Sequence, residues 1–157
     1  MSADLRRAAE ADLATLVALI NRAYEVEKFF VDGDRISPAQ VSELLSRGVF
    51  LLGEDGGAPV ACVYVEITGN RGYFGLLAVE PGRQGRGWGR VMVEAAEQHA
   101  RAAGCVVMDL SVVNLRAELP PFYHRLGYVE TGTAPFTDQR ATQPCHFVLM
   151  SKSLEEA

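Results

Sequence analysis

Cysteine is scarce in this sequence, and its placement excludes a fold held by disulfides. Only three of the 157 residues are cysteines, and an odd number of widely separated thiols does not make a disulfide framework. Cys62, Cys105 and Cys145 each stand among apolar neighbours, which is typical of buried, reduced thiols. We therefore expect a reducing compartment. The sequence also lacks closely spaced cysteine and histidine pairs, so we expect no metal site.

Positive charge and long apolar runs are lacking as well. The formal net charge is -5, so the basic face of a nucleic-acid-binding protein is not expected. No uncharged apolar run approaches the roughly 18 residues that a membrane-spanning helix needs. The first residues, Met1-Ser2-Ala3-Asp4-Leu5-Arg6-Arg7, do not form the apolar core of a signal peptide. These absences predict a cytoplasmic protein that binds neither a membrane nor a nucleic acid.

What is present fits one globular domain over residues 1–157, because the chain is 48% hydrophobic and shows no repeat or linker. Apolar residues at steps of three and four predict a helix over 10–26, and Ser37-Pro38 predicts the start of a second helix. Later segments predict strands and two more helices. The strands are expected near Leu5 and over 49–52, 58–67, 73–79, 105–113 and 145–150, and the helices over about 89–103 and 121–126. Their order predicts an α/β fold built on a mixed sheet.

Residues 83–90 read RQGRGWGR, a glycine-rich segment between a predicted strand and a predicted helix. The first amides of a helix lack partners and carry partial positive charge, and glycines let an anion approach them closely. The segment therefore predicts a bound phosphate or pyrophosphate, with a flexible surface turn as the alternative. A P-loop is excluded because Arg90-Val91 follows Gly89, and a dinucleotide fingerprint is disfavoured because its third glycine is replaced by Arg90.

The sequence from Leu77 to Arg90 resembles the acetyl-CoA-binding segment of the GNAT superfamily of N-acetyltransferases. The pattern Gln/Arg-x-x-Gly-x-Gly/Ala is met by Gln84, Gly87 and Gly89, and a second block, Asn114 followed by Pro121-Phe122-Tyr123-His124-Arg125-Leu126-Gly127-Tyr128, resembles another part of the family. The resemblance implies a mixed sheet of about six or seven strands flanked by about four helices. It also implies that the two central strands, those ending at Val79 and Val113, splay apart.

A cofactor follows from the resemblance: acetyl-CoA, with coenzyme A as product. Its pantetheine arm is expected to pair with the main chain of the central strand, and its pyrophosphate with the amides of the glycine segment. The residues that the resemblance assigns to the cofactor are Leu77, Ala78, Val79, Gln84, Gly85, Arg86, Gly87, Trp88, Gly89, Asn114 and Tyr123.

Acetyl transfer to an amine needs a proton for the departing thiolate, and Tyr123 matches the family tyrosine that donates it; a core residue at a helix-sheet contact is the alternative. The family's early carboxylate is absent, because residues 71–75 read Arg-Gly-Tyr-Phe-Gly. Glu66 is then the nearest candidate for a base, acting through water, and a solvent-facing glutamate is the alternative.

The acceptor is expected to meet the first two helices and the loop between them. This loop carries Phe29 and Phe30 among acids such as Glu27, which suits a small cationic amine; core packing of the two phenylalanines is the alternative. The prediction is thus an acetyl-CoA-dependent N-acetyltransferase acting on a small or amino-acid-like amine. Acetylation of a protein N-terminus or lysine and a non-catalytic acyl-CoA sensor are the alternatives, and a homodimer is possible.

Overall fold

The computed structural model describes residues 3–155, so the outermost residues of the predicted domain 1–157 lie outside the described residues. Within the described residues there are four α-helices, seven strands and three short 3-10 helices. Their bounds are β1 Ala3–Arg7, η1 Glu10–Asp12, α1 Leu13–Ala23, η2 Tyr24–Glu27, α2 Pro38–Arg47, β2 Val49–Asp55, β3 Ala58–Thr68, β4 Arg71–Val79, η3 Pro81–Arg83, α3 Trp88–Ala102, β5 Val107–Val113, α4 Leu119–Arg125, β6 Val129–Pro135 and β7 His146–Ser153. Within this part of the chain, no helix combines the length and apolar character needed to cross a membrane.

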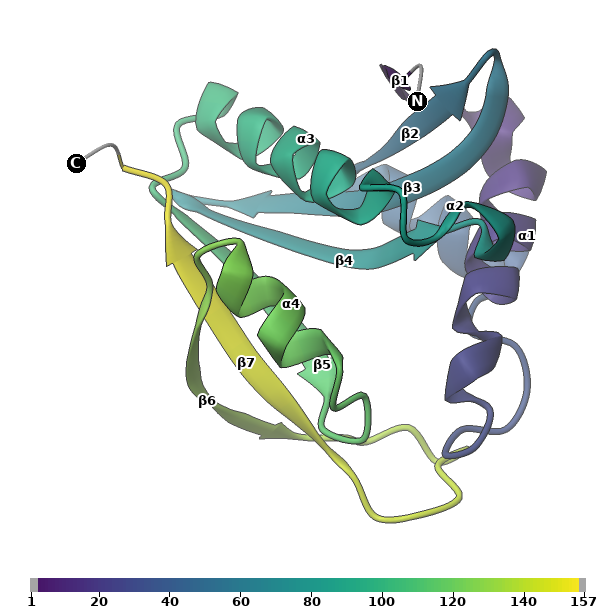
Figure 1. The fold of residues 1–157 in the computed structure, drawn as a ribbon, viewed down its shortest axis with the longest axis vertical. Helices are drawn as coiled ribbons and strands as arrows, with labels where there is room; N and C mark the ends of the chain where they lie inside the picture. Colours follow the sequence, from purple (N-terminus) through teal and green to yellow (C-terminus); the bar gives the residue numbers. More distant parts are fainter. Residues whose placement is uncertain (1–2, 156–157) are drawn as a thin grey trace.

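The strands form one mixed sheet in the order β1-β2-β3-β4-β5-β7-β6. All neighbours are antiparallel except β4 and β5, which run parallel at the centre of the sheet. This parallel pair is short, because only Arg71–Tyr73 of β4 pairs with Val107–Asp109 of β5. Beyond it the two strands diverge and open the sheet into a V (Figure 1). The predicted fold class and the predicted splay are both confirmed.

Helices cover both faces of the β2-β3-β4 half of the sheet. α3 lies on one face and buries Met92, Ala96 and Ala100 completely, whereas α1 and α2 lie on the other (Figure 1). Strand alternation sorts the side chains of β3 between the two layers. Val63 and Val65 pack in the α3 cluster, and Cys62 and Tyr64 pack in the α1-α2 cluster.

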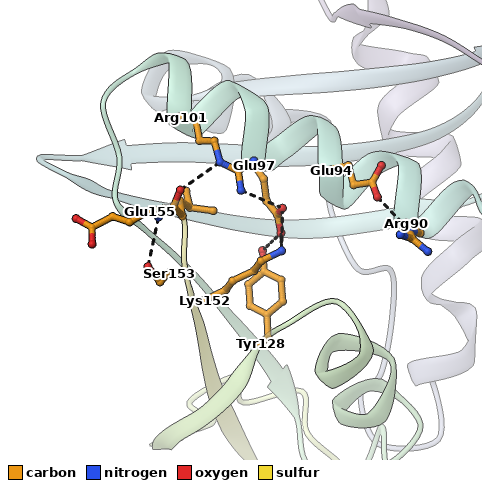
Figure 2. Close-up of polar contacts among 9 residues, drawn as sticks. Arg90, Glu94, Glu97, Arg101, Tyr128, Lys152, Ser153 and Glu155 are labelled. Carbon is orange, nitrogen blue, oxygen red and sulfur yellow. Dashed lines mark hydrogen bonds and ion pairs between the residues drawn. The ribbon is translucent and has the colours of Figure 1, made fainter. Parts of the chain in front are cut away.

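A buried polar cluster fixes α3 at the closed end of the V (Figure 2). Glu97 of α3 is only 4% exposed. Its carboxylate accepts hydrogen bonds from the Tyr128 hydroxyl at 2.8 Å and from the Lys152 ammonium of β7 at 3.1 Å. Burial, followed by the nearby Glu97 charge, raises the pKa of Tyr128 well above its usual value. The cluster joins α3 to β7 and thereby sets where the N-terminus of α3 lies.

Three local predictions differ from the structure. The region predicted as one helix over 10–26 is an α-helix between two 3-10 turns. The strand β6 was not predicted, because it is an edge strand that is exposed almost throughout and shows no apolar alternation. Cys145 is half-buried rather than buried, whereas Cys62 and Cys105 are buried as predicted, and all three are free thiols.

The helix start at Ser37 is confirmed, since its side chain accepts a hydrogen bond from the Gln40 amide at 3.2 Å.

Candidate active site

The opening between β4 and β5 contains a cavity of about 350 Å³. Its walls come from six parts of the fold: η2 with the loop before α2, the middle of β4, β5, α4, the loop between β6 and β7, and the start of β7. Both strands contribute backbone as well as side chains because they no longer pair with each other there. The cavity therefore has the unpaired edges of two central strands inside it.

A β-bulge shapes the β4 wall. In the β3-β4 ladder Cys62 lies opposite Ala78, but Tyr64 lies opposite Gly75, so β4 holds one residue more than β3 across this step. The extra residue is accommodated at Leu76, whose φ of 52° is the only positive value of a non-glycine residue among those described. From Phe74 to Val79 the β4 edge that faces β5 has no strand partner. The predicted cofactor residues Leu77, Ala78 and Val79 all lie in this stretch, and Leu77 lines the cavity.

The glycine segment follows β4 and leaves its backbone amides free. Gly85 and Gly87 adopt φ values of 78° and 88°, which a glycine reaches without strain. The amide of Arg83 donates to Glu80 O and that of Val91 to Gly87 O. Between them, the amides of residues 84–90 donate no hydrogen bond to any described residue. They surround the N-terminus of α3, where the helix dipole favours an anion.

The side chains of this segment have different surroundings. Arg83 is paired with Asp55 at 2.6 Å and the exposed Arg90 with Glu94 at 2.9 Å (the latter pair is drawn in Figure 2), whereas Arg86 is exposed and makes no ion pair within residues 3–155. Trp88 is 2% exposed and packs in the α3 core. Only the backbone of Trp88 is therefore accessible to a ligand. The side chain of Gln84 donates to Val79 O at 3.3 Å, which joins the segment to the end of β4.

Tyr123 lies on α4 and lines the cavity. The residue is 5% exposed, and its ring contacts Phe74 edge-on with centroids 5.8 Å apart. Its hydroxyl makes no hydrogen bond within the described range, yet no fully buried side-chain oxygen or nitrogen there lacks a partner. The hydroxyl must therefore retain contact with the cavity space. Burial, followed by the neighbouring Tyr24, raises the pKa of Tyr123 well above its usual value.

Glu66 does not line this cavity. It lines a second cavity of about 340 Å³ between α2 and the β3-β4 hairpin, which shares a wall with the first: Arg35, Tyr73, Gly75 and Leu76 line both. The Tyr64 hydroxyl donates to Glu66 at 3.2 Å, and Arg47 lies 3.7 Å from the same carboxylate. Burial, and next the Glu66 charge, raise the pKa of Tyr64 to about 12. Glu66 is thus a neighbour of the site and not a part of its wall.

Asn114 has a structural role, and its predicted cofactor contact stays a prediction. Its backbone amide donates to His146 O at 2.9 Å, and its side-chain oxygen accepts from the His146 amide at 2.8 Å. Both contacts tie the end of β5 to the start of β7. Because His146 lies 32 positions away in the sequence, this use of Asn114 could not be read from its local pattern.

Of the residues predicted to bind the acceptor, only Glu27 lines the cavity. Glu27 lines the cavity and pairs with Arg116 at 2.7 Å, and burial raises the pKa of Glu27 although Arg116 opposes the shift. Phe30 is completely buried against Phe136, and Phe29 is 54% exposed outside the cavity. The prediction of an aromatic wall from Phe29 and Phe30 is therefore wrong. Phe30 is buried because the loop after α1 packs on the loop between β6 and β7.

The loop after α1 and the loop between β6 and β7 are hydrogen-bonded to each other. They cover the side of the cavity at residues 27–35 and 136–140, which we call the acceptor end because the acceptor is predicted to bind there. The Asp32 amide donates to Arg140 O at 3.0 Å and the Thr142 amide to Phe30 O at 2.8 Å. The Arg140 guanidinium adds a bond to Asp34 O at 2.6 Å. The contacts close this side of the cavity with main chain from two segments more than 100 positions apart.

Sequence reasoning missed several residues of the cavity wall. They come from the bulged strand, from β5 and from the two loops: Tyr24, Arg35, Tyr73, Ser111, Phe136, Asp138 and Arg140. Tyr24 continues the apolar stripe of α1, so its place near the sheet could have been inferred. The loop residues carry no such signal, because their position depends on contacts between distant segments.

Comparison with solved structures places this architecture in a known class. The ribosomal-protein-S18-alanine N-acetyltransferase of Escherichia coli superposes with a TM-score of 0.80 at 19% identity, over 99% of this chain and 96% of that one. The protein yncA of Salmonella typhimurium, solved with acetyl-CoA, gives 0.77 at 20% identity over 100% and 96%. The paiA N-acetyltransferase of Thermoplasma acidophilum, solved with coenzyme A, gives 0.79 at 16% identity over 98% and 99%. The chain thus has the fold of N-acetyltransferases.

The sequence itself makes the assignment to a family. The family model described as acetyltransferase (GNAT) domain matches residues 46–130, more than half of the chain. The matched range runs from the end of α2 to the start of β6 and includes β4, the glycine segment, α3 and α4. The protein belongs to the GNAT acetyltransferase family.

Proposed function

We propose that the protein transfers the acetyl group of acetyl-CoA to the amine of a small molecule. The observation that carries this proposal is the run of amides over residues 84–90 that donate no hydrogen bond to any residue of the described structure, placed directly after a strand edge that has no partner there. Such a run at a helix N-terminus suits a diphosphate, and an unpaired strand edge suits the amides of a pantetheine arm. The two features adjoin in the order in which these groups occur in coenzyme A.

The glycine segment fits the proposed ligand sterically as well as electrostatically. A Cβ added at Gly85 would meet no heavy atom within 4 Å, so the space beside that backbone is open. Arg86 is the exposed cation of the segment without an ion-pair partner among the described residues, and we assign it to the phosphates. Bound acetyl-CoA supplies an activated thioester carbonyl, and the protein supplies the binding and orientation that bring the amine to it.

Tyr123 is proposed as the general acid. The phenol is protonated at neutral pH and can give a proton, and the burial that raises its pKa makes it a weaker acid than an exposed tyrosine. Its hydroxyl has no protein partner to compete for that proton in the described structure, and it lies on the cavity wall. Tyr123 Oη therefore holds a proton that it donates to the departing thiolate as the acetyl group moves to the amine nitrogen.

Glu66 is proposed as the acceptor of the amine proton, through water rather than by contact. The second cavity, which Glu66 lines, adjoins the first at residues that line both. The proposed proton transfer through water would cross between the two cavities at this place. Glu66→Gln would then slow turnover most at low pH, where few amine molecules are already neutral. Equal slowing at all pH values would remove Glu66 from the mechanism.

The hydrogen bonds between the two loops support a small acceptor over a protein acceptor. A peptide substrate needs an open groove beside the acceptor end, and here the main chains of residues 29–32 and 140–142 are bonded across it. A small amine needs only the enclosed volume.

Calorimetry with coenzyme A and a thiol-release assay with acetyl-CoA and a panel of amines test the proposal together. We expect saturable coenzyme A binding and release of thiol with at least some of the small amines. No binding at millimolar coenzyme A would contradict it. Binding without turnover of any amine or peptide would indicate a sensor of acyl-CoA instead.

A further inference from the structure

The charges on the cavity wall are unevenly matched. Its acidic side chains each have a cation of their own: Glu27 pairs with Arg116 at 2.7 Å, and Asp138 pairs with Arg140 at 3.0 Å. Two cationic side chains on the same wall, Lys28 and Arg35, have no ion-pair or hydrogen-bond partner among residues 3–155. The acceptor end therefore carries surplus positive charge in a protein whose net charge is -5.

Arg35 has the more informative position of the two. It follows the hydrogen-bonded part of the α1-α2 loop and lines both cavities, at the wall that they share. Of the arginines that line either cavity, Arg140 is held by Asp138 and Arg47 by Glu43 and Glu66. Arg35 is the one without a carboxylate at ion-pair distance among the described residues, although its charge also acts on Glu27 and Asp138, which are each paired with another arginine.

An aromatic ring holds the Arg35 guanidinium in place. Its central carbon lies 5.4 Å from the centroid of the Tyr24 ring, within the range of a cation-π contact. Such a contact uses the face of the guanidinium and leaves the N–H groups at its edge free. These edge donors match the two oxygens of a carboxylate. Tyr24 in turn lies near enough to Tyr123 to affect its pKa, so Arg35 and the proposed acid are both neighbours of the same tyrosine.

We propose that the acceptor is an amine that also carries a carboxylate, an amino acid, and that Arg35 binds this carboxylate. The inference rests on the proposed function, because it names the substrate class of the same site. It narrows the expectation of a small or amino-acid-like amine to an amino acid, and Glu27, the acid that suggested a cationic acceptor, is already paired with Arg116. Lys28 adds a second positive charge on the same wall without the planar geometry of Arg35.

Matched acceptor pairs test the proposal. Thiol release from acetyl-CoA is measured for each proteinogenic amino acid and for its primary carboxamide, with the wild-type protein, Arg35→Gln and Arg35→Lys. We expect a higher kcat/KM for the carboxylate member of a pair, even though the amide's amine is less basic and more of it is neutral. Arg35→Gln should lower kcat/KM for the carboxylates about 30-fold, chiefly through KM, and leave the amides unchanged, because it removes charge-assisted hydrogen bonds to the carboxylate alone. Arg35→Lys should restore part of the loss.

Arg7→Gln is the matched control, because Arg7 is an exposed arginine of β1 without a partner in the described structure and lies outside both cavities. It should leave both members of each pair unchanged. Amides that react as well as the carboxylates, or equal effects of Arg35→Gln on both, would overturn the proposal while the acetyltransferase function stands.

A second measurement distinguishes a failure of the proposed acetyltransferase function from a failure of the proposed carboxylate binding by Arg35. Calorimetry measures the binding of N-acetyl amino acids and N-acetyl amino acid amides to the protein saturated with coenzyme A, which requires no turnover. Tighter binding of the acids, lost in Arg35→Gln, supports the role of Arg35 even if no amine is acetylated. Equal binding of acids and amides, or no binding of either, contradicts it.

Discussion

The two ends of the central β4-β5 pair are built in opposite ways. At the closed end the strands are paired, and the buried Glu97 carboxylate has the Tyr128 hydroxyl and the Lys152 ammonium as partners. At the open end the strands diverge, and the amides of residues 84–90, the Tyr123 hydroxyl and the Arg35 guanidinium have no hydrogen-bond or ion-pair partner in the described structure. The same helix, α3, runs from the open end to the closed one.

This difference separates groups that stabilise the fold from groups that remain available for a ligand. A polar group that is buried without a partner destabilises a protein, so partners are expected wherever water is excluded. Groups that stay unpartnered beside a cavity are exempt, because water satisfies them until a ligand replaces it. Substitutions at the closed end should therefore change stability, and substitutions at the open end should change binding or turnover.

Removing one tyrosine hydroxyl at each end is the sharpest comparison. Tyr123→Phe should lower kcat about 100-fold, as expected for loss of a general acid, and should leave the free energy of unfolding nearly unchanged because no hydrogen bond is lost. Tyr128→Phe should keep kcat and lower the free energy of unfolding by about 1.5 kcal/mol, because the Glu97 carboxylate loses a donor. Steady-state kinetics and urea unfolding measure both. A Tyr123→Phe variant with wild-type kcat would remove the proposed acid.

A charge placed in the glycine segment should act on binding alone. Gly87 precedes the first residue of α3, and both Asp and Asn tolerate positive φ and can cap a helix. Gly87→Asp should weaken coenzyme A binding about 50-fold relative to Gly87→Asn, because only Asp repels a diphosphate. Calorimetry gives the ratio, and thermal unfolding should show both variants folded. Equal affinities would place the diphosphate elsewhere.

The same Glu→Gln substitution at two positions of α3 tests how much the buried cluster at the closed end stabilises the fold. Glu97→Gln should lower the free energy of unfolding by about 2 kcal/mol, because it leaves the Lys152 ammonium without its counter-charge. Glu94→Gln should change it by less than about 0.5 kcal/mol, since its pair with Arg90 is exposed. Urea unfolding of both variants supplies the comparison. Similar values would mean that the closed end is not specially stabilised by its buried cluster.

The smallest expected effect is the pH dependence that the buried Cys62 thiol gives to the free energy of unfolding. Cys62 lies behind the β4 bulge, and burial raises the pKa of its thiol to about 12. Because the folded pKa is above the unfolded one, the native state binds more protons above about pH 9, and its contribution to stability is lost as pH rises. Between pH 8 and pH 10 the wild type should lose about 1 kcal/mol more than Cys62→Ala. Parallel stability curves for the two proteins would contradict the assignment.

Local patterns were enough to predict much of this molecule. The strand over 58–67, the cap at Ser37 and the position of the glycine segment between a strand and a helix each depend on neighbours in the sequence, and the structure has them as predicted. The placement of Tyr123 on a helix facing the sheet followed from the family pattern. Local periodicity and turn chemistry act within a few residues, so they are visible in a single sequence.

Features that depend on distant contacts could not be predicted. The bulge at Leu76 uses a positive φ at a residue that disfavours it. Phe30 is buried by a loop more than 100 positions away, and Asn114 is engaged by His146. Arg35 stands in a polar loop with no local sign that it faces a cavity. The acceptor end was predicted worst because it is assembled from such segments.

Within residues 3–155 the amides of residues 84–90 donate no hydrogen bond, and we propose that they bind a diphosphate. Two-dimensional amide NMR of the labelled protein tests it most directly, by titration with coenzyme A and, separately, with pantetheine, which lacks the diphosphate. We expect coenzyme A to shift the resonances of Gln84 to Arg90 and to slow their hydrogen exchange, and pantetheine to do neither. Coenzyme A binding that leaves these amides unshifted would contradict it.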